Sequence, residues 1–192
     1  GREERLRNWY YVKELSGDFI VEQSIHSLDV ATWIIGADPI RARGAGGRKL
    51  RPRDSIWDHF AVTYWFPDDL VLSFTCIQSV PGIRDEIRCR AYGSDGVIDT
   101  DYFGSVRIQG TKPYEGGSTG NLYTTGAVTN IDEFHDAVVK GDYANATAPA
   151  SVRSNLTAIL GREAGYRGGE ISLEELIKAG ARLELDRTGL KD

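Results

Sequence analysis

Methionine is absent from the 192 residues of this sequence, and cysteine and histidine are scarce, with two and three residues respectively. Because a complete translation product begins with methionine, we expect the chain to be a fragment or a processed product that lacks upstream sequence. Two cysteines, Cys76 and Cys89, are too few for a disulfide framework, so we expect both to be reduced core residues. Three scattered histidines and two cysteines predict no metal site.

Long apolar runs and a strong charge bias are also missing. No stretch approaches the roughly 20 apolar residues that span a bilayer, and the chain does not start with a basic and then apolar signal peptide. The formal net charge is −5, with acidic and basic residues well mixed, which excludes the basic surface typical of nucleic-acid or membrane-surface binding. We expect a cytoplasmic protein with no nucleic-acid or membrane partner, although an export signal would lie in the upstream sequence.

Motifs that hold nucleotides or activate nucleophiles are absent as well. The chain contains no G-x-G-x-x-G turn, and its stretch GAGGRK is not a phosphate-binding loop because no Gly-Lys-Ser/Thr follows. It also lacks the G-x-S-x-G elbow of hydrolases and the H-E-x-x-H pattern of zinc proteases. We therefore expect no Rossmann dinucleotide-binding domain within this chain.

The apolar spacing divides the chain into a helix, a run of strands and closing helices. Residues 17–36 have helical spacing, and residues 57–80 alternate with period two around a Pro-Asp-Asp turn, which predicts a hairpin. One strand is expected before that hairpin and three short ones after it, followed by a polar loop over residues 112–126. Further helices are expected over the ranges 130–141, 148–169 and 172–180, the last opened by a Ser-x-x-Glu capping box.

This order predicts an α+β fold with a single domain over residues 1–192. We expect an open, largely antiparallel (mixed) sheet of about six or more strands with helices packed on one face. In the hairpin, one face of the first strand is predicted to carry Phe60, Val62, Tyr64 and Phe66, and one face of the second strand is predicted to carry Leu70, Leu72, Phe74 and Cys76. Apolar residues occur on both faces, so we expect homo-oligomerisation through the face away from the helices.

The predicted helix over residues 17–36 carries a polar stripe beside its apolar face. Val21, Ile25, Leu28 and Ile35 are expected to face the sheet, and Glu22, His26, Asp29 and Trp33 form the neighbouring stripe. Glu22 and His26 are one turn apart, so the carboxylate would orient the imidazole and favour its charged form. The pair predicts a proton donor and acceptor, although the same spacing also suits an exposed pair that only supports the helix.

Two segments resemble a known family. The stretch SGDFIVEQSIHSLDVATWIIGADP is similar to the C-terminal domain of the Gfo/Idh/MocA NAD(P)-dependent sugar and cyclitol oxidoreductases. That family has a glycine-rich approach, an Asp-x-x-x-His pair, then Leu-Asp and an aromatic residue before glycine. The stretch NATAPASVRSNLTAILGREAGYRGGEISLEELIKA is similar to the family's closing helix pair, and the resemblance covers essentially the whole chain.

The resemblance implies roles for particular residues. His26 matches the catalytic histidine, which exchanges a proton with the substrate hydroxyl as hydride moves to or from nicotinamide. Glu22 stands where the family usually has Asp and would orient His26. The family's catalytic lysine belongs to the dinucleotide-binding domain, outside this chain, and we do not assign its role to Lys13. NAD or NADP would be bound mainly by that missing domain, with Gly17 as the contact from this chain.

Other side chains are weaker candidates for binding a sugar-like substrate. They are Asp29, the aromatic residues Trp9, Tyr10 and Tyr11, and also Arg84 and Tyr123. The three aromatic residues suit either a pocket wall or core packing, and His59 and His135 are expected to be structural. The implied function is the C-terminal half of an oxidoreductase that transfers a hydride between NAD(P) and a hydroxyl or carbonyl carbon of a sugar, cyclitol or related polyol. The alternatives are a non-catalytic sheet module for homo-oligomerisation, or a lyase or hydrolase on the same scaffold.

Overall fold

A computed structural model describes residues 2–51, 55–78, 80–83, 85–144, 146–186 and 188. The chain divides into two compact units, Gly1–Ile83 with Val152–Asp192, and Arg84–Ser151. In these described ranges, no helix is both long and apolar enough to cross a membrane. The single domain over residues 1–192 stays a prediction.

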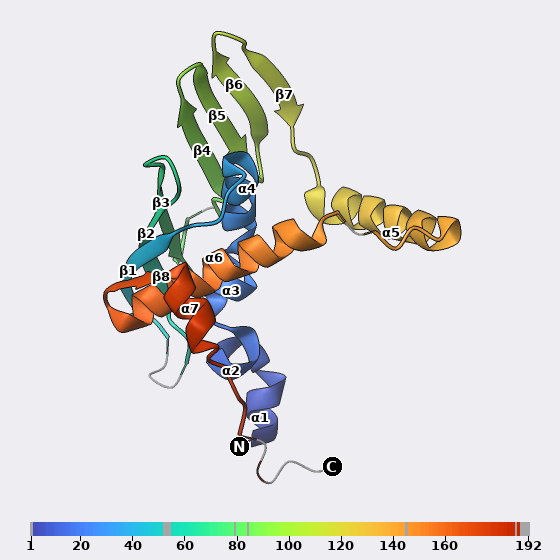
Figure 1. Cartoon of the computed structure of the whole chain (residues 1–192). Helices are drawn as coiled ribbons and strands as arrows, with labels where there is room; N and C mark the ends of the chain where they lie inside the picture. The colour runs from blue at the N-terminus through green and yellow to red at the C-terminus, as the bar shows by residue number, and fades with distance from the viewer. Residues whose placement is uncertain are drawn as a thin grey trace. The chain divides into compact units, whose positions relative to one another are not determined.

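The first unit places helices against a four-stranded antiparallel sheet with the strand order β3-β2-β1-β8. Its strands are β1 (Arg41–Gly47), β2 (His59–Trp65), β3 (Val71–Ile77) and β8 (Glu170–Ser172). Its helical segments are α1 (Arg2–Arg7), η1 (Trp9–Tyr11), α2 (Lys13–Ser16), α3 (Phe19–Glu22), α4 (Ile25–Ile35), α6 (Ala148–Arg167, which begins in the other unit) and α7 (Leu173–Ala179). Figure 1 shows α3, α4 and α6 beside this sheet, and α7 directly after β8.

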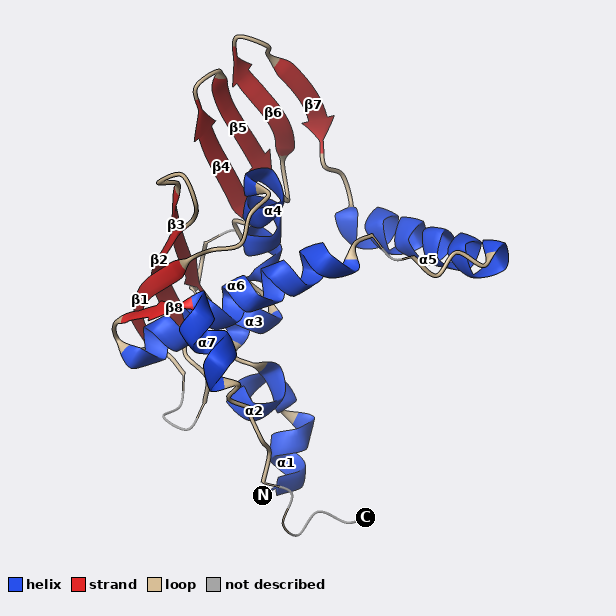
Figure 2. Cartoon of the chain, in the orientation of Figure 1, coloured by secondary structure: helices blue, strands red, loops and turns tan. Residues whose placement is uncertain are grey.

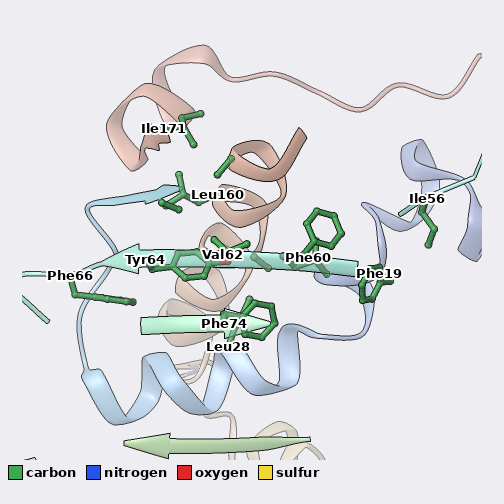
Figure 3. Packing of buried hydrophobic residues seen from close by; sticks show 14 residues of the cluster. Phe19, Leu28, Ile56, Phe60, Val62, Tyr64, Phe66, Phe74, Leu160 and Ile171 are labelled. Carbon is green, nitrogen blue, oxygen red and sulfur yellow. The ribbon is translucent and has the colours of Figure 1, made fainter. Parts of the chain in front are cut away.

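The predicted hairpin forms the centre of the core. Phe60, Val62, Tyr64 and Phe66 are buried, as the alternation predicts, and Phe74 is buried on β3 while Leu72 and Cys76 pack against the core. The register pairs Val62 with Phe74 and Tyr64 with Leu72, so the two strands present one continuous apolar face. Figure 3 shows the side chains of these strands between Leu160 and Leu28 in that view. The prediction was wrong for Leu70, which precedes β3 in the turn and is 40% exposed.

Small residues let α6 approach the sheet closely. A Cβ atom at Gly165 would lie 3.0 Å from the Phe60 ring, and one at Gly161 would lie 1.9 Å from the Tyr64 hydroxyl oxygen. Ala158, Leu160 and Ala164, on the same helix, are fully buried. The glycines of this helix therefore fit the space left by the aromatic rings of β2, and any side chain there would overfill the core.

The caps of the last helix follow the sequence signals. The hydroxyl oxygen of Ser172 accepts a hydrogen bond from the Glu175 N–H at 3.0 Å, and Gly180 ends α7 in the left-handed conformation. The expected capping box is thereby confirmed at its serine end.

The second unit consists of a separate antiparallel sheet and one long helix. The sheet, with the order β4-β5-β6-β7, contains β4 (Arg88–Gly93), β5 (Gly96–Asp101), β6 (Ser105–Gly110) and β7 (Tyr114–Ser118), and Figure 2 shows the four strands side by side. The helix is α5 (Leu122–Lys140). The predicted polar loop over residues 112–126 was wrong, because β7 and the first turn of α5 occupy it. The side chain of Asn121 caps that turn by accepting a hydrogen bond from the Thr124 N–H at 3.4 Å.

The α+β class and the open, antiparallel sheets are confirmed. The strands form two sheets of four rather than one larger sheet, and β8, from the far end of the chain, completes the first sheet by pairing with β1. Cys76 and Cys89 are both free thiols. Burial raises the pKa of Cys76 to about 12 and also raises that of Cys89, so both are weak nucleophiles.

The Tyr64 hydroxyl gives a prediction about stability. This oxygen is buried and has no hydrogen-bond partner among the described residues, so Tyr64→Phe should raise the free energy of unfolding by about 1–2 kcal/mol in urea denaturation. Gly161→Ala should lower it by about 1–3 kcal/mol or more. In the Tyr64→Phe background that loss should shrink, because the nearest clashing atom is gone; equal losses in both backgrounds would contradict the packing described here.

Candidate functional site

The predicted helix over residues 17–36 is interrupted. Helix α2 ends at Gly17, which has a φ of 76°, and α3 and α4 are separated by Gln23 and Ser24. The N–H groups of both Gln23 and Ser24 lie 2.9 Å from the carbonyl oxygen of Phe19, so the turn widens there and the regular helical ladder stops. The prediction of one continuous helix was therefore wrong, and Glu22 and His26 lie on different helices.

The two predicted catalytic residues remain four positions apart, on either side of this break. Glu22, the last residue of α3, is half-buried, and His26, in the first turn of α4, is exposed. Trp33, further along the predicted stripe, is 78% exposed. The interruption means that regular helical geometry does not dictate contact between the carboxylate and the imidazole, and their catalytic pairing stays a prediction.

Asp29 has a defined partner within the first unit. Its carboxylate accepts a hydrogen bond from the Ser154 hydroxyl of α6, and the Thr32 hydroxyl lies 3.4 Å from that same oxygen of Ser154. Asp29 therefore helps to hold α4 against α6. Its proposed contact with substrate is in addition to this structural contact and stays a prediction.

The predicted aromatic wall comes from η1. Trp9, Tyr10 and Tyr11 meet edge to face, with ring centroids 6.1 and 5.3 Å apart, and Trp9 and Tyr11 are nearly half exposed, at 46% and 47%. Half-exposed aromatic rings of this kind suit contact with the apolar faces of a sugar.

Tyr10 connects this wall to the residue after Glu22. Its hydroxyl donates to Oε1 of Gln23 at 3.0 Å and accepts from the Gln78 side-chain amide, which also contacts Gln23. Burial raises the pKa of Tyr10, and the nearby charge of Glu22 adds to the rise. The structure thus brings Tyr10 and Glu22 into one neighbourhood, together with Gln23 and Gln78, which the sequence did not single out.

Asp18 is the main structural residue that sequence reasoning missed. This residue is fully buried and adopts a φ of 76°, which is uncommon outside glycine. Its Oδ1 accepts the Phe19 N–H at 2.7 Å, and its Oδ2 accepts the Trp57 N–H at 3.3 Å and the Tyr166 hydroxyl at 2.6 Å. An Asp directly before a helix is an N-cap signal, and it was available in the sequence.

Gly17 has structural reasons to be glycine. Besides its positive φ, a Cβ there would lie 3.3 Å from Val21, and its carbonyl oxygen accepts a hydrogen bond from Arg162 Nη1 at 3.0 Å. Arg162 is itself buried on α6. These contacts account for Gly17 without a ligand, so its contact with a cofactor stays a prediction. Lys13, one turn earlier, places its Nζ 4.0 Å from the centre of the Tyr166 ring.

Two predicted residues belong to the second unit, Arg84–Ser151. Tyr123 is 71% exposed and meets the Tyr102 ring edge to face at 5.7 Å. Arg84 lies outside the described residues. Substrate binding by either residue stays a prediction.

His59, expected to be structural, pairs with a buried carboxylate. Its Nδ1 lies 2.7 Å from Oδ1 of Asp58. The other carboxylate oxygen accepts three consecutive backbone N–H groups, from Lys49, Leu50 and Arg51, at 2.7, 2.7 and 3.2 Å. Burial alone would raise the pKa of Asp58, but these hydrogen bonds outweigh it and hold the pKa well below its usual range. Asp58 therefore fixes the turn after β1.

Possible sites for a metal ion or another ligand in the described residues are clusters of metal-binding side chains and surface depressions. Among the described ranges, no group of three or more His, Cys, Asp or Glu side chains is placed to hold a metal ion. An open depression of about 710 Å³ lies between the segment that precedes β1 and α7, and Asp38, Pro39, Ile40, Leu173, Glu174, Ile177 and Lys178 line it. It includes none of the predicted site residues.

Comparisons with known proteins agree with the resemblance in the sequence. A family model described as the GFO/IDH/MocA C-terminal domain matches residues 1–99. A search of curated proteins finds no match.

Solved structures with the same fold have low sequence identity. Levoglucosan dehydrogenase in complex with NADH and L-sorbose has a TM-score of 0.70 and 14% identity over 88% of this chain and 54% of that chain. The myo-inositol 2-dehydrogenase from Lactobacillus plantarum has a TM-score of 0.66 and 16% identity over 88% of this chain and 52% of that chain. UDP-N-acetylglucosamine 3-dehydrogenase GnnA from Acidithiobacillus ferrooxidans has a TM-score of 0.65 and 18% identity over 79% of this chain and 48% of that chain. The likeness shows the fold, and this chain spans about half the length of each protein.

The buried carboxylate of Asp18 generates a pH prediction. Burial raises its pKa above the ordinary value of 3.8 despite the hydrogen bonds from Tyr166 and two backbone amides. A carboxyl whose pKa is raised on folding binds its proton more tightly in the folded state, so its contribution to stability falls as the pH rises above 3.8. Asp18→Asn cannot titrate and should lose this dependence.

The measurement is urea denaturation of wild type and Asp18→Asn between about pH 4 and pH 7. Asp18→Asn is expected to be less stable overall, because its amide NH₂ replaces one accepting oxygen. The difference in unfolding free energy should nevertheless move in favour of Asp18→Asn as the pH rises. Asp68→Asn, in an exposed turn, is the control, and a constant difference for Asp18→Asn would refute the raised pKa.

Proposed function

The chain belongs to the GFO/IDH/MocA C-terminal domain family, and we propose that it is the substrate-binding half of an oxidoreductase acting on a sugar, cyclitol or related polyol. The observation that carries this proposal is the neighbourhood of Glu22 and His26. An exposed imidazole follows a half-buried carboxylate beside a wall of partly exposed aromatic rings. An acid–base residue next to a surface suited to sugar rings is what oxidation of a hydroxyl group requires.

The cofactor in this proposal is NAD or NADP. It supplies the carbon that accepts or returns the hydride. The described residues of this chain offer no phosphate-binding glycine turn, and the internal contacts of Gly17 explain that residue. The dinucleotide would thus be held mainly by a separate domain, and the role of this chain is to bind and orient the substrate and to move a proton.

His26 would exchange the proton of the reacting hydroxyl at its imidazole ring, and Glu22 would favour the charged form of that ring. Trp9, Tyr10 and Tyr11 would stack against the substrate. Tyr10 is well placed to fix this wall relative to Glu22, because its hydroxyl is held by Gln23, the residue that follows Glu22.

The test of this function is turnover by the full-length protein. His26→Ala should lower turnover by about 10²–10⁴-fold, and it should leave the affinity for NADH and the folded state intact because His26 is exposed. Glu22→Gln should lose less activity, since the amide still accepts a hydrogen bond. His135→Ala, an exposed histidine on α5, is the matched control. Turnover near the wild-type level in His26→Ala would show that the polar stripe is structural.

Homo-oligomerisation is the second part of the proposal. The face of the first sheet away from the core exposes Ala45, Ala61 and Thr75, together with Val71 at 51% and Ile77 at 68%. By register the same face also carries Arg41, Arg43, His59 and Trp65. The small and apolar side chains around Ala61 suit pairing with an identical face across a two-fold axis.

Sedimentation of the protein at tens of micromolar tests this pairing. We expect a dimer or tetramer for the wild type and dissociation for Ala61→Arg, which places a charge at the centre of the face without touching the core. Thr129→Arg, on exposed α5, controls for the added charge. A monomeric wild type would contradict the proposal.

A further inference from the structure

Arg51 lies in an unusual environment for a cation. Its guanidinium carbon is 5.4 Å from the ring centre of Tyr10, 5.0 Å from that of Tyr11 and 5.8 Å from that of Phe19. Phe19 belongs to the hydrophobic core and is 1% exposed. The guanidinium thus bridges the core and the aromatic wall of the candidate site.

The polar contacts of this guanidinium are incomplete. Its Nε and Nη1 atoms are buried and have no hydrogen-bond partner among the described residues, and the same holds for the nearby acceptor Oε1 of Gln78. The ion pairs between described residues do not include Arg51. A cation that has lost part of its hydration without gaining a counter-charge is costly, and contacts with aromatic rings offset only part of that cost.

Asp58, the nearest described carboxylate after Arg51 in the sequence, already has partners. Asp58 accepts the backbone N–H of Arg51, but that same oxygen also accepts the N–H groups of Lys49 and Leu50, and its other oxygen contacts His59. Glu22 is near enough to Tyr10 to affect the electrostatics of its phenol, as is Arg51 itself. The positive charge therefore lies within the neighbourhood of Glu22 and Tyr10, where a bound substrate would be.

We propose that Arg51 binds an oxyanion of the substrate, either the carboxylate of a sugar acid or the phosphate of a sugar phosphate. Carboxylates and phosphates share the charge and the oxygen acceptors that a guanidinium recognises. Arg51 is half-buried, and the Tyr11 ring 5.0 Å from its guanidinium carbon is half exposed, so the guanidinium stands close to the exposed side of the aromatic wall. Gln78 Oε1, which is also buried and without a hydrogen-bond partner among the described residues, would accept a hydroxyl of the same sugar. This inference rests on the proposed function, because it defines the substrate class of the same site.

The experiment measures binding rather than turnover. The full-length protein is titrated calorimetrically with D-glucose, D-glucuronate and D-glucose 6-phosphate, each at constant ionic strength, and separately with NADH. We expect wild type to bind one of the two anionic sugars at least about 10-fold more tightly than glucose, since hydrogen bonds to charged groups are the strong ones. The anionic sugar that binds more tightly identifies either the carboxylate or the phosphate as the group that Arg51 recognises.

Variants then assign the preference to Arg51. Arg51→Gln should reduce the affinity for the preferred anionic sugar by about 10- to 100-fold and leave the affinities for glucose and NADH unchanged. The affinity of Arg51→Lys for the preferred anionic sugar should lie between those of wild type and Arg51→Gln, because lysine keeps the charge but lacks the planar donors. Arg182→Gln, an exposed arginine after α7, should behave as wild type. A large loss of NADH affinity in Arg51→Gln would instead assign the guanidinium to the cofactor and overturn the proposal.

The wild-type comparison decides the matter even if Arg51→Gln fails to fold, because equal affinity for glucose and both anionic sugars refutes the inference. The outcome is separable from that of the proposed function. If turnover needs His26 but no anionic sugar is preferred, only the inference about Arg51 fails. If the anionic preference depends on Arg51 while His26→Ala keeps full turnover, the acid–base assignment fails and the oxyanion site stands.

Discussion

The buried carboxylate of Asp18 is the interaction on which the arrangement of the first unit depends. It joins the start of α3, the segment before β2 and the end of α6 through the Phe19 N–H, the Trp57 N–H and the Tyr166 hydroxyl. The positive φ of Asp18 costs on the order of 1–3 kcal/mol, and burial of the carboxylate adds to that cost. Both are tolerated because three donors converge on one group and leave its oxygens satisfied.

This anchor positions the candidate site. Asp18 caps the start of α3, and Glu22 lies one turn later, so the backbone at Glu22 is held relative to α6. Arg162 strengthens the same joint by donating to the carbonyl oxygen of Gly17. The exposed residues of the site thus stand on a rigid buried base, which is the arrangement that a binding or catalytic constellation needs.

The sequence predicts features whose signals are local. The β2–β3 hairpin follows from its alternation, and the capping box before α7 follows from four adjacent residues. The role of Asp18 as an anchor between three segments was not predictable in this way, because its partners Trp57 and Tyr166 lie 39 and 148 positions away. The same limit applies to the site, where alternation and motif gave His26, Glu22 and Tyr10 but not the tertiary contacts of Arg51.

The second unit has little core of its own. None of its described residues is buried. Its sheet places Arg90, Asp99 and Arg107 opposite one another on one side, while Ala91, Ile98 and Ile108 pair on the other. Helix α5 likewise exposes Ile131, Phe134 and Val138 by 65%, 69% and 56%. A sheet and a helix that bury so little cannot offset the entropy of ordering them. The apolar sides of this sheet and this helix are therefore left uncovered within the unit.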